Sequence, residues 1–266
     1  MKVTPIDILC SPSAKTPEVT MPRLTKGRYA ARLAESPADI AACQRLRGLA
    51  FHGPDAPPDA DAFDAACLHV MVTDTGDGAL VGCFRLLPLA TGAEIARSYS
   101  AQFYELSALR EFDKPMVELG RFCLHPDRHD PDILRVAWGA MTAYVDAHGV
   151  GMLFGCSSFQ GTDGELYRDA FALLTERHLA PSRWLPRVKS PRVFPFAQGL
   201  ARVKPDFKRA MRAMPPLLRT YLLMGGWVSD HAVVDREMNT LHVFTGLEIG
   251  AIPPARARLL RATAAA

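Results

Sequence analysis

Two stretches of the chain carry charged side chains inside what otherwise reads as buried β-strand. The run Val117–Cys123 contains Glu118 and Arg121, and the apolar run Leu80–Pro88 contains Arg85. Burying a charge is costly unless the charge is paired or used in chemistry. A carboxylate in such a place can act as a general base, and an arginine can bind an anionic group. The two runs therefore predict a polar site set into a sheet, with a structural ion pair as the alternative.

The spacing of Glu118 and Arg121 sets a condition on that site. Side chains alternate between the two faces of a regular strand, so these two residues would point in opposite directions. They can serve one site only if the strand bulges or splays near Gly120, and glycine makes such an irregularity easier. We therefore expect an irregular strand at this point.

A helix is expected just upstream of these strands. Ser36 is a typical N-cap and Pro37 a typical first helical residue, so the helix should run from there to about Phe51. Arg47 lies one turn before Phe51, so both can face the same pocket, unless Arg47 only extends to the rim of the protein.

The remaining pattern favours an α/β fold with one mixed sheet flanked by helices. The other expected elements, in chain order, are strands at 28–34, 67–73 and 79–87, a helix at 94–109, a strand at 116–124, a helix at 132–148, a strand at 152–156, a helix at 163–176, a helix begun by Pro215-Pro216, and strands at 232–234 and 240–244.

Length and composition fit an ordinary globular protein of 266 residues, 48% hydrophobic and 22% charged. We expect a flexible N-terminal arm at 1–25, one domain at 26–250 and a basic tail at 251–266. The net charge of +3 is too small to argue for nucleic-acid binding. Basic residues concentrate between Arg177 and Arg219, which favours an acidic partner protein, an anionic membrane or a phosphate-bearing substrate, unless they form a solvated face.

Cysteine usage and hydropathy bear on location. The six cysteines form no C-x-x-C pair, which favours a reducing compartment. We expect no signal peptide and no membrane-spanning helix, hence a cytoplasmic protein that at most lies on the inner face of the cytoplasmic membrane. No metal site is expected, because Pro126 interrupts the spacing of His125 and His129. The segment Gly155–Phe159 resembles part of a nucleophile elbow but lacks its closing glycine.

Four motifs in a fixed order carry a family resemblance: Arg47-x-x-x-Phe51, Asp61-x-x-Asp64, Gly82–Pro88 and Glu118–Phe122. In this combination the chain resembles the acyl-homoserine-lactone synthases and their relatives on the GNAT acyltransferase fold, which move an acyl chain from acyl carrier protein to an amine. It is more similar to the bacterial L-ornithine Nα-acyltransferases, which make lyso-ornithine lipid from ornithine and 3-hydroxyacyl carrier protein. The similarity covers about residues 27–250.

Two departures from the wider pattern refine the resemblance. Lactone synthases of this type usually have serine where Gly120 stands, which argues against lactone formation. The glycine-rich loop that cradles phosphate in GNAT enzymes is missing, since the segment 126–134 contains no glycine. This favours a donor held through a carrier protein over free acyl-CoA.

The resemblance implies a mechanism in which the α-amine of ornithine attacks the thioester directly. Glu118 would be the base, with Arg121 beside it as a second catalytic residue. Backbone N–H groups near the irregular strand would stabilise the oxyanion. No cofactor would be bound, since acyl-phosphopantetheine arrives on the carrier protein. The substrate-binding residues would be Arg47, Phe51, Asp61, Asp64 and Arg85.

Two further surfaces follow from the same resemblance. The acyl chain would lie near Phe84, Phe122 and Phe154. Carrier protein or membrane would dock on basic residues, namely Arg183, Arg187, Lys189, Arg192, Lys204, Lys208 and Arg209. The alternatives are an enzyme of the same scaffold that acylates another amino acid or homoserine, and a non-catalytic membrane-associating protein that uses the basic tail.

Overall fold

The computed structural model describes residue 21 and residues 23–264, and most of the predicted N-terminal arm lies outside this range. A ten-stranded sheet runs through it in the order β1-β2-β3-β4-β6-β7-β12-β11-β9, with β10 paired to β12. Its strands are β1 (Leu24–Lys26), β2 (Tyr29–Leu33), β3 (Leu68–Asp74), β4 (Leu80–Leu89), β6 (Met116–Leu124), β7 (Met152–Gln160), β9 (Val193–Phe194), β10 (Trp227–Val228), β11 (Ala232–Asp235) and β12 (Thr240–Glu248).

Strand direction changes at one place in the middle of this sheet. β6 and β7 are parallel, whereas every other pair in the sheet order is antiparallel. The connection between β6 and β7 is the helix α2 (Pro131–Ala147), as a parallel crossover requires. A separate two-stranded sheet pairs β5 (Tyr104–Glu105) with β8 (Arg187–Val188). The predicted mixed α/β sheet is confirmed.

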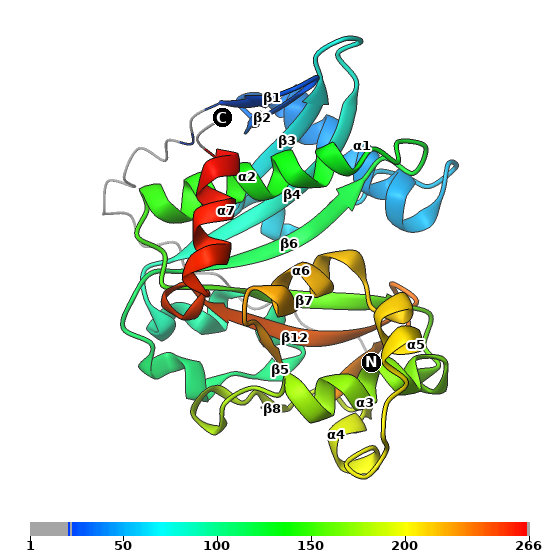
Figure 1. Cartoon of the computed structure of the whole chain (residues 1–266). Helices are drawn as coiled ribbons and strands as arrows, with labels where there is room; N and C mark the ends of the chain where they lie inside the picture. Colours follow the sequence, from blue (N-terminus) through cyan, green and yellow to red (C-terminus); the bar gives the residue numbers. More distant parts are fainter. Residues whose placement is uncertain (1–20, 22, 265–266) are drawn as a thin grey trace.

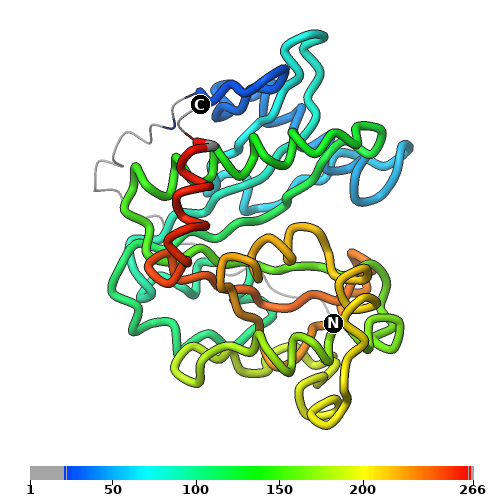
Figure 2. Tube along the Cα trace, in the orientation of Figure 1, coloured from blue at the N-terminus to red at the C-terminus, as the bar shows by residue number. Residues whose placement is uncertain are grey.

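The helices cover both faces of the sheet (Figure 1). α2, α6 (Pro216–Leu223) and α7 (Pro254–Ala264) lie on one face. α1 (Pro37–His52) packs on β4 and β6 from the other face. The remaining helices are α3 (Arg168–Arg177), α4 (Phe196–Gly199) and α5 (Phe207–Ala213). Figure 2 shows the last helix, in red, crossing back beside α2.

The predicted starts of α1 and α2 are confirmed by their caps, whereas the helix expected from 163 begins with the 3-10 turn Gly164–Tyr167 and becomes α3 only at Arg168. The Ser36 hydroxyl accepts a hydrogen bond from the Asp39 amide at the start of α1. The Asp130 carboxylate accepts one from Asp132 at the start of α2. β1 was not predicted, and it begins within the stretch expected to form the N-terminal arm.

The predicted helix at 94–109 is wrong. This segment forms three short 3-10 helices, Gly92–Arg97, Ser100–Gln102 and Ser107–Glu111, with β5 between the last two. In an α-helix the amides of Tyr99 and Ser100 would bond to carbonyls four residues back. Here both amides donate to the carboxylate of Glu118 instead, which ends the helical pattern.

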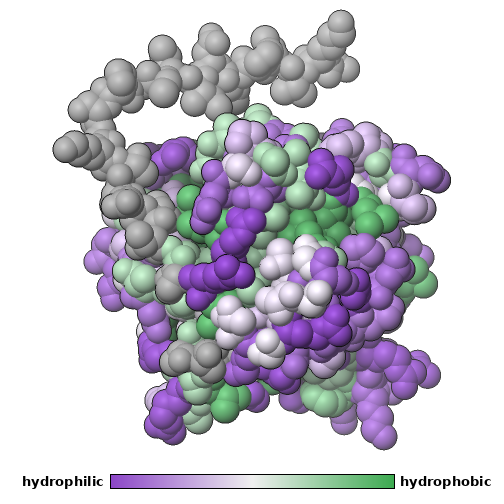
Figure 3. All heavy atoms as spheres, turned by 90° about the horizontal axis from the view of Figure 1, so that it is seen from above, coloured by the Kyte–Doolittle hydropathy of each residue, from purple (hydrophilic) through white to green (hydrophobic). Residues whose placement is uncertain are grey.

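The outer surface is mainly polar. Figure 3 shows one face of the molecule, on which hydrophilic side chains surround a smaller hydrophobic area. Isolated exposed apolar side chains are normal for globular proteins. In the part of the chain that the structure describes, no helix has the length and apolar character needed to cross a bilayer.

Candidate active site

The parallel strands β6 and β7 separate at their carboxyl ends and open a cavity. Their pairing runs from Met116 opposite Met152 to Leu119 opposite Gly155 and stops there. Beyond that point lies a cavity of about 310 Å³. Glycine is required at position 155, where the pairing of the two strands ends, because a Cβ there would lie 2.3 Å from the carbonyl oxygen of Leu119. The cavity is thus a consequence of how two core strands diverge.

The expected strand irregularity lies at Arg121. Cys83 of β4 pairs with Cys123 of β6, but Arg85 pairs with Gly120, so two residues of β6 oppose one residue of β4. Arg121 has a φ of +49°, in the left-handed region that few non-glycine residues adopt. This β-bulge turns the side chain of Arg121, and Glu118 and Arg121 both line the cavity.

Glu118 is buried and held by three donors. Its carboxylate accepts hydrogen bonds from the Tyr99 amide at 2.7 Å, the Ser100 amide at 2.7 Å and the Ser100 hydroxyl at 2.6 Å. Burial raises the pKa of Glu118, and this outweighs the opposing effect of those hydrogen bonds. A carboxylate offers about four acceptor positions. One position therefore remains through which Glu118 can take a proton.

Three arginines and three aspartates form an ion-pair network beside the cavity. Arg47 binds both carboxylate oxygens of Asp64, at 2.7 and 2.9 Å. Arg85 reaches Asp64 at 2.7 Å and also pairs with Asp61. The network is closed by Asp59, which lies 3.0 Å from the Nε atoms of both Arg47 and Arg121. Its six formal charges cancel.

The ion-pair network argues against the substrate-binding role expected for Arg47, Asp61 and Asp64. Arg47 has 1% of its surface exposed and is not among the residues that line the cavity, so the prediction that it shares a pocket with Phe51 is wrong. Asp61 and Asp64 are bound by arginines and so lack free oxygens for a substrate cation. Burial alone would raise the pKa of Asp61, but the hydrogen bond with Arg85 and the charges of Arg85 and Arg121 together lower it overall. Asp59 was not singled out from the sequence.

The predicted acyl-pocket residues do not lie together. Phe122 lines the cavity and stacks on Phe84 at 5.5 Å, but Phe84 is itself buried in the core beneath α2. Phe154 lies in a different part of the core and stacks on Phe244 at 5.7 Å. Phe84 and Phe154 do not line the cavity. Side chains alternate between the two faces of a strand, and this alternation directs the rings of Phe84 and Phe154 into the packed core and away from the place where β6 and β7 separate.

The cavity has an apolar side and a polar side. Leu217 and Leu218 of α6 reach it together with Phe122 on the face of the sheet that α2 covers. Tyr99 and Glu118 reach it on the opposite face, as do Cys156, Asp235 and His242. An apolar chain and a charged amino acid could therefore approach the splay from opposite faces of the sheet.

Several polar residues that line the cavity were not predicted from the sequence. The Tyr99 ring lies 5.1 Å from the guanidinium of Arg121. Burial lowers the pKa of His242 to about 4, so this imidazole is neutral near pH 7. Asp235 ends the apolar run that forms β11, and this acid at the end of a strand was the one feature of the sequence that could have indicated a site residue there.

Cys156 is a poor nucleophile in this setting. Burial raises its pKa to about 12, and its sulfur lies 3.4 Å from the Ser100 hydroxyl. A thiol needs a lowered pKa to react as a thiolate near neutral pH. The geometry thus fits direct transfer between two substrates better than a thioester on the enzyme.

The basic residues expected to form one docking surface fall into two groups. Four of them lie before, within and after β8, and three lie before or at the start of α5. Figure 1 shows these elements on different sides of the lower half of the molecule. The first group is Arg183, Arg187, Lys189 and Arg192, and the second is Lys204, Lys208 and Arg209.

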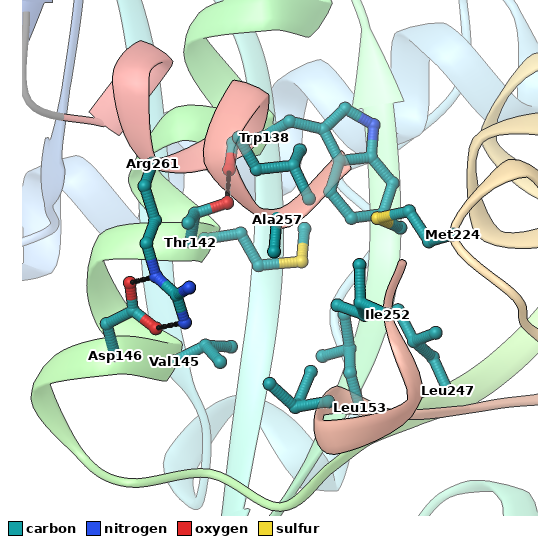
Figure 4. Close-up of a pocket in the computed structure, with 13 residues that line it drawn as sticks. Trp138, Thr142, Val145, Asp146, Leu153, Met224, Leu247, Ile252, Ala257 and Arg261 are labelled. Atoms are coloured by element: carbon teal, nitrogen blue, oxygen red, sulfur yellow. Dashed lines mark hydrogen bonds and ion pairs between the residues drawn. The ribbon is translucent and has the colours of Figure 1, made fainter. Parts of the chain in front are cut away.

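The basic tail is a helix packed on the domain. α7 covers a small apolar pocket of about 40 Å³ together with α2, β7 and β12 (Figure 4). Its Arg261 pairs with both carboxylate oxygens of Asp146, at 2.8 and 3.0 Å. The pocket is too small for an acyl chain while α7 is in place. Within the described part of the chain, no group of three or more His, Cys, Asp or Glu residues could hold a metal ion.

Comparisons with known proteins agree with this geometry. A model of the acetyltransferase (GNAT) domain matches residues 47–139. The chain is 36% identical to the L-ornithine N(alpha)-acyltransferase of Rhodobacter capsulatus, over 81% of this chain and 88% of that protein. It is 32% identical to the protein of the same name from Rhizobium meliloti, over 83% of this chain and 80% of that protein. The chain is therefore an acyltransferase with a GNAT fold and belongs to the L-ornithine N(alpha)-acyltransferase family.

Proposed function

We propose that this enzyme transfers a 3-hydroxyacyl chain from acyl carrier protein to the α-amine of L-ornithine, giving lyso-ornithine lipid. The observation that carries the proposal is the two-sided cavity in the splay between β6 and β7. The names of the similar proteins support ornithine as the acceptor.

The acceptor would bind on the polar side of the cavity. An α-amine with a pKa near 8 is largely protonated at neutral pH, so a base must take its proton before it can attack. Glu118 would do so through its remaining acceptor position, directly or through one water. Arg121, which lines the same side, would bind the carboxylate of the amino acid.

The donor would bind on the apolar side, with its thioester at the splay. Backbone N–H groups that β6 and β7 no longer use for mutual pairing would stabilise the oxyanion. Collapse of the tetrahedral intermediate would then expel the phosphopantetheine thiolate and leave an amide on the acceptor. No bound cofactor takes part in these steps.

The start of α2 supports a carrier protein as the donor over free acyl-CoA. A helix N-terminus is a common site for binding phosphate groups. Here the Asp130 carboxylate already accepts hydrogen bonds from the Asp132 amide at 2.9 Å and from the Tyr29 hydroxyl at 2.9 Å. Two carboxylates at this end would repel a pyrophosphate. Of the two basic groups, we propose the one around β8 for carrier-protein docking, because its Arg192 borders a hollow that adjoins the cavity.

An assay with purified components tests the proposal. The full-length protein would be incubated with L-ornithine and either 3-hydroxyacyl carrier protein or the matching 3-hydroxyacyl-CoA, and the products identified by mass spectrometry. We expect Nα-acylated ornithine from the carrier-protein donor, a much lower rate from acyl-CoA, and loss of product with Glu118→Ala. Glu165→Ala, which removes a 63% exposed side chain, is the control.

The outcomes separate the parts of the proposal. An active wild-type enzyme that prefers acyl-CoA would refute the donor. Acylation of another amino acid in preference to ornithine would refute the acceptor. A Glu118→Ala enzyme that keeps full activity would refute the role of Glu118.

A further inference from the structure

Asp235 is a carboxylate of the cavity that the mechanism above leaves unused. Four charged residues line the cavity: Arg85, Glu118, Arg121 and Asp235. The two arginines are paired with aspartates, and Glu118 has its three donors. Unlike the two arginines, Asp235 forms no ion pair among the described residues, and unlike Glu118 it accepts hydrogen bonds through only one of its oxygens.

The hydrogen bonds of Asp235 use only one of its two oxygens. Oδ1 accepts the amides of Glu237 and Met238, both at 3.0 Å, which fixes the carboxylate at the end of β11. Oδ2 takes part in none of the hydrogen bonds or ion pairs of the described residues. A carboxylate held rigidly by its own turn, with one oxygen open to a cavity, is prepared to bind a cation.

The position of Asp235 is on the acceptor side. Asp235, Tyr99, Arg121 and Met238 line both the cavity and the adjoining hollow that Arg192 borders, so they form the boundary between the two. The negative charges of Glu118 and Asp235 both add to the effect of burial on the pKa of Cys156. Asp235 and the proposed base Glu118 therefore both contribute to the electrostatic potential within the same part of the cavity.

We propose that Asp235 binds the side-chain ammonium of the acceptor and so selects a diamino acid over a neutral amino acid of equal length. The proposal rests on the proposed function and names the residue that recognises the second amine. Asp61 and Asp64, the aspartates expected from the sequence, are occupied by arginines.

The same contact would direct the acyl group to the α-amine. Ornithine carries two amines, and only an unprotonated amine attacks a thioester. A carboxylate next to the side-chain ammonium favours its charged form and so keeps it unreactive. The α-amine would meanwhile lose its proton to Glu118 and attack. Asp235 would therefore control which of two similar nucleophiles reacts.

Asp235→Asn is the sharpest test, because the Asn side-chain oxygen can still accept the amides of Glu237 and Met238. kcat/KM would be measured with L-ornithine and with L-norvaline, which has the same carbon chain without the terminal amine. We expect Asp235→Asn to lower kcat/KM for ornithine about 10- to 100-fold, the range for hydrogen bonds to charged groups. The value for norvaline should change less than about threefold. The control is Glu237→Gln, which removes an exposed charge from the same turn.

Each outcome decides the proposal. An equal loss on both substrates would assign Asp235 a structural role, and no loss on either would remove it from substrate binding. A loss shared by Glu237→Gln would point to the overall negative charge of the turn. Wild-type enzyme that fails to acylate ornithine would overturn the proposed function itself, whereas an active wild type with an unchanged ornithine-to-norvaline ratio in Asp235→Asn would overturn only this inference.

Discussion

Replacing Arg47 with methionine separates a structural role from a substrate-binding one. Methionine fills part of the space of the arginine stem but removes its charge and its donors. Arg47 is 1% exposed and pairs with Asp64 and Asp59. The substitution would leave buried carboxylates with less compensation, and removing one partner of a buried ion pair costs about 3–5 kcal/mol.

The structure favours the lower end of that range. Asp64 would keep Arg85 at 2.7 Å and Gln44 at 2.9 Å, and Asp59 would keep Arg121 at 3.0 Å. We therefore expect a loss of about 3 kcal/mol. In a protein of this size, about 1 kcal/mol shifts the melting temperature by about 2–4 °C, so the fall should be about 6–12 °C.

Thermal denaturation and steady-state kinetics on the same preparations provide the assay. Arg168→Met is the matched control, because Arg168 forms an exposed pair with Glu165 that should contribute less than about 1 kcal/mol. At a temperature well below melting, Arg47→Met should keep kcat/KM within about threefold, since Arg47 does not line the cavity. An unchanged melting temperature together with a large loss of activity would refute the reasoning and restore Arg47 as a substrate ligand.

The pH dependence provides a second check on the same variant. Burial alone would raise the pKa of Asp64, but its hydrogen bonds with Arg47, Gln44 and Arg85 together hold that pKa below its ordinary value of 3.8. A carboxylate with a lowered pKa contributes stability above its unfolded pKa and loses it as the pH falls through the folded value. The difference in melting temperature between wild type and Arg47→Met should therefore be constant from about pH 8 to 5 and shrink below about pH 4.

Three further predictions follow from the site and its surroundings. Glu118→Gln should lower kcat about 10²- to 10⁴-fold, the usual contribution of a general base. Because burial raises the pKa of Glu118 above 4.5, the kcat/KM of the wild type should fall at acid pH with an apparent pKa above that value. This fall should be absent from any residual activity of the variant. Gly155→Ala should destabilise the protein by about 1–3 kcal/mol in urea unfolding, because the new Cβ would lie 2.3 Å from the Leu119 carbonyl oxygen. The control is Gly149→Ala, whose Cβ would meet no atom within 4 Å but whose φ is +57°, and it should cost less than about 2 kcal/mol in the same assay. Removing residues 254–266 should expose the pocket beneath α7 and speed limited proteolysis of α2; an unchanged cleavage rate would show that α7 does not protect it.

Local chemistry in the sequence was sufficient to place many of the elements. The serine and proline at the start of α1 satisfy or remove free amides of the first turn, so that helix could be located from neighbouring residues alone. The hairpin of β3 and β4 and the strand β6 follow in the same way from short apolar runs with a turn between them. Glu118 and Arg121 were also found from the sequence, because a charge within a buried strand conflicts with its surroundings.

Long-range contacts decided what the sequence left open. The segment 94–109 has helical character, but Glu118 captures two of the amides that a helix needs. Glu118 is about twenty residues away in the chain, beyond the reach of any local pattern.

What the sequence by itself determined was the family, the strand that carries the charged residues and the need for an irregularity near Gly120. Only the tertiary structure decided the use of each charge. Arg47, Arg85 and Arg121 look equally available in the sequence, but their partners come from the loop at 59–64, and the resulting network keeps Arg47 away from the cavity while Arg85 and Arg121 line it. Asp235 looks like an ordinary strand end, and it enters the site because β11 ends at the wall of the cavity. Pairing and burial depend on which segments meet in space, and these set the free energy of a charge far more than its neighbours in sequence.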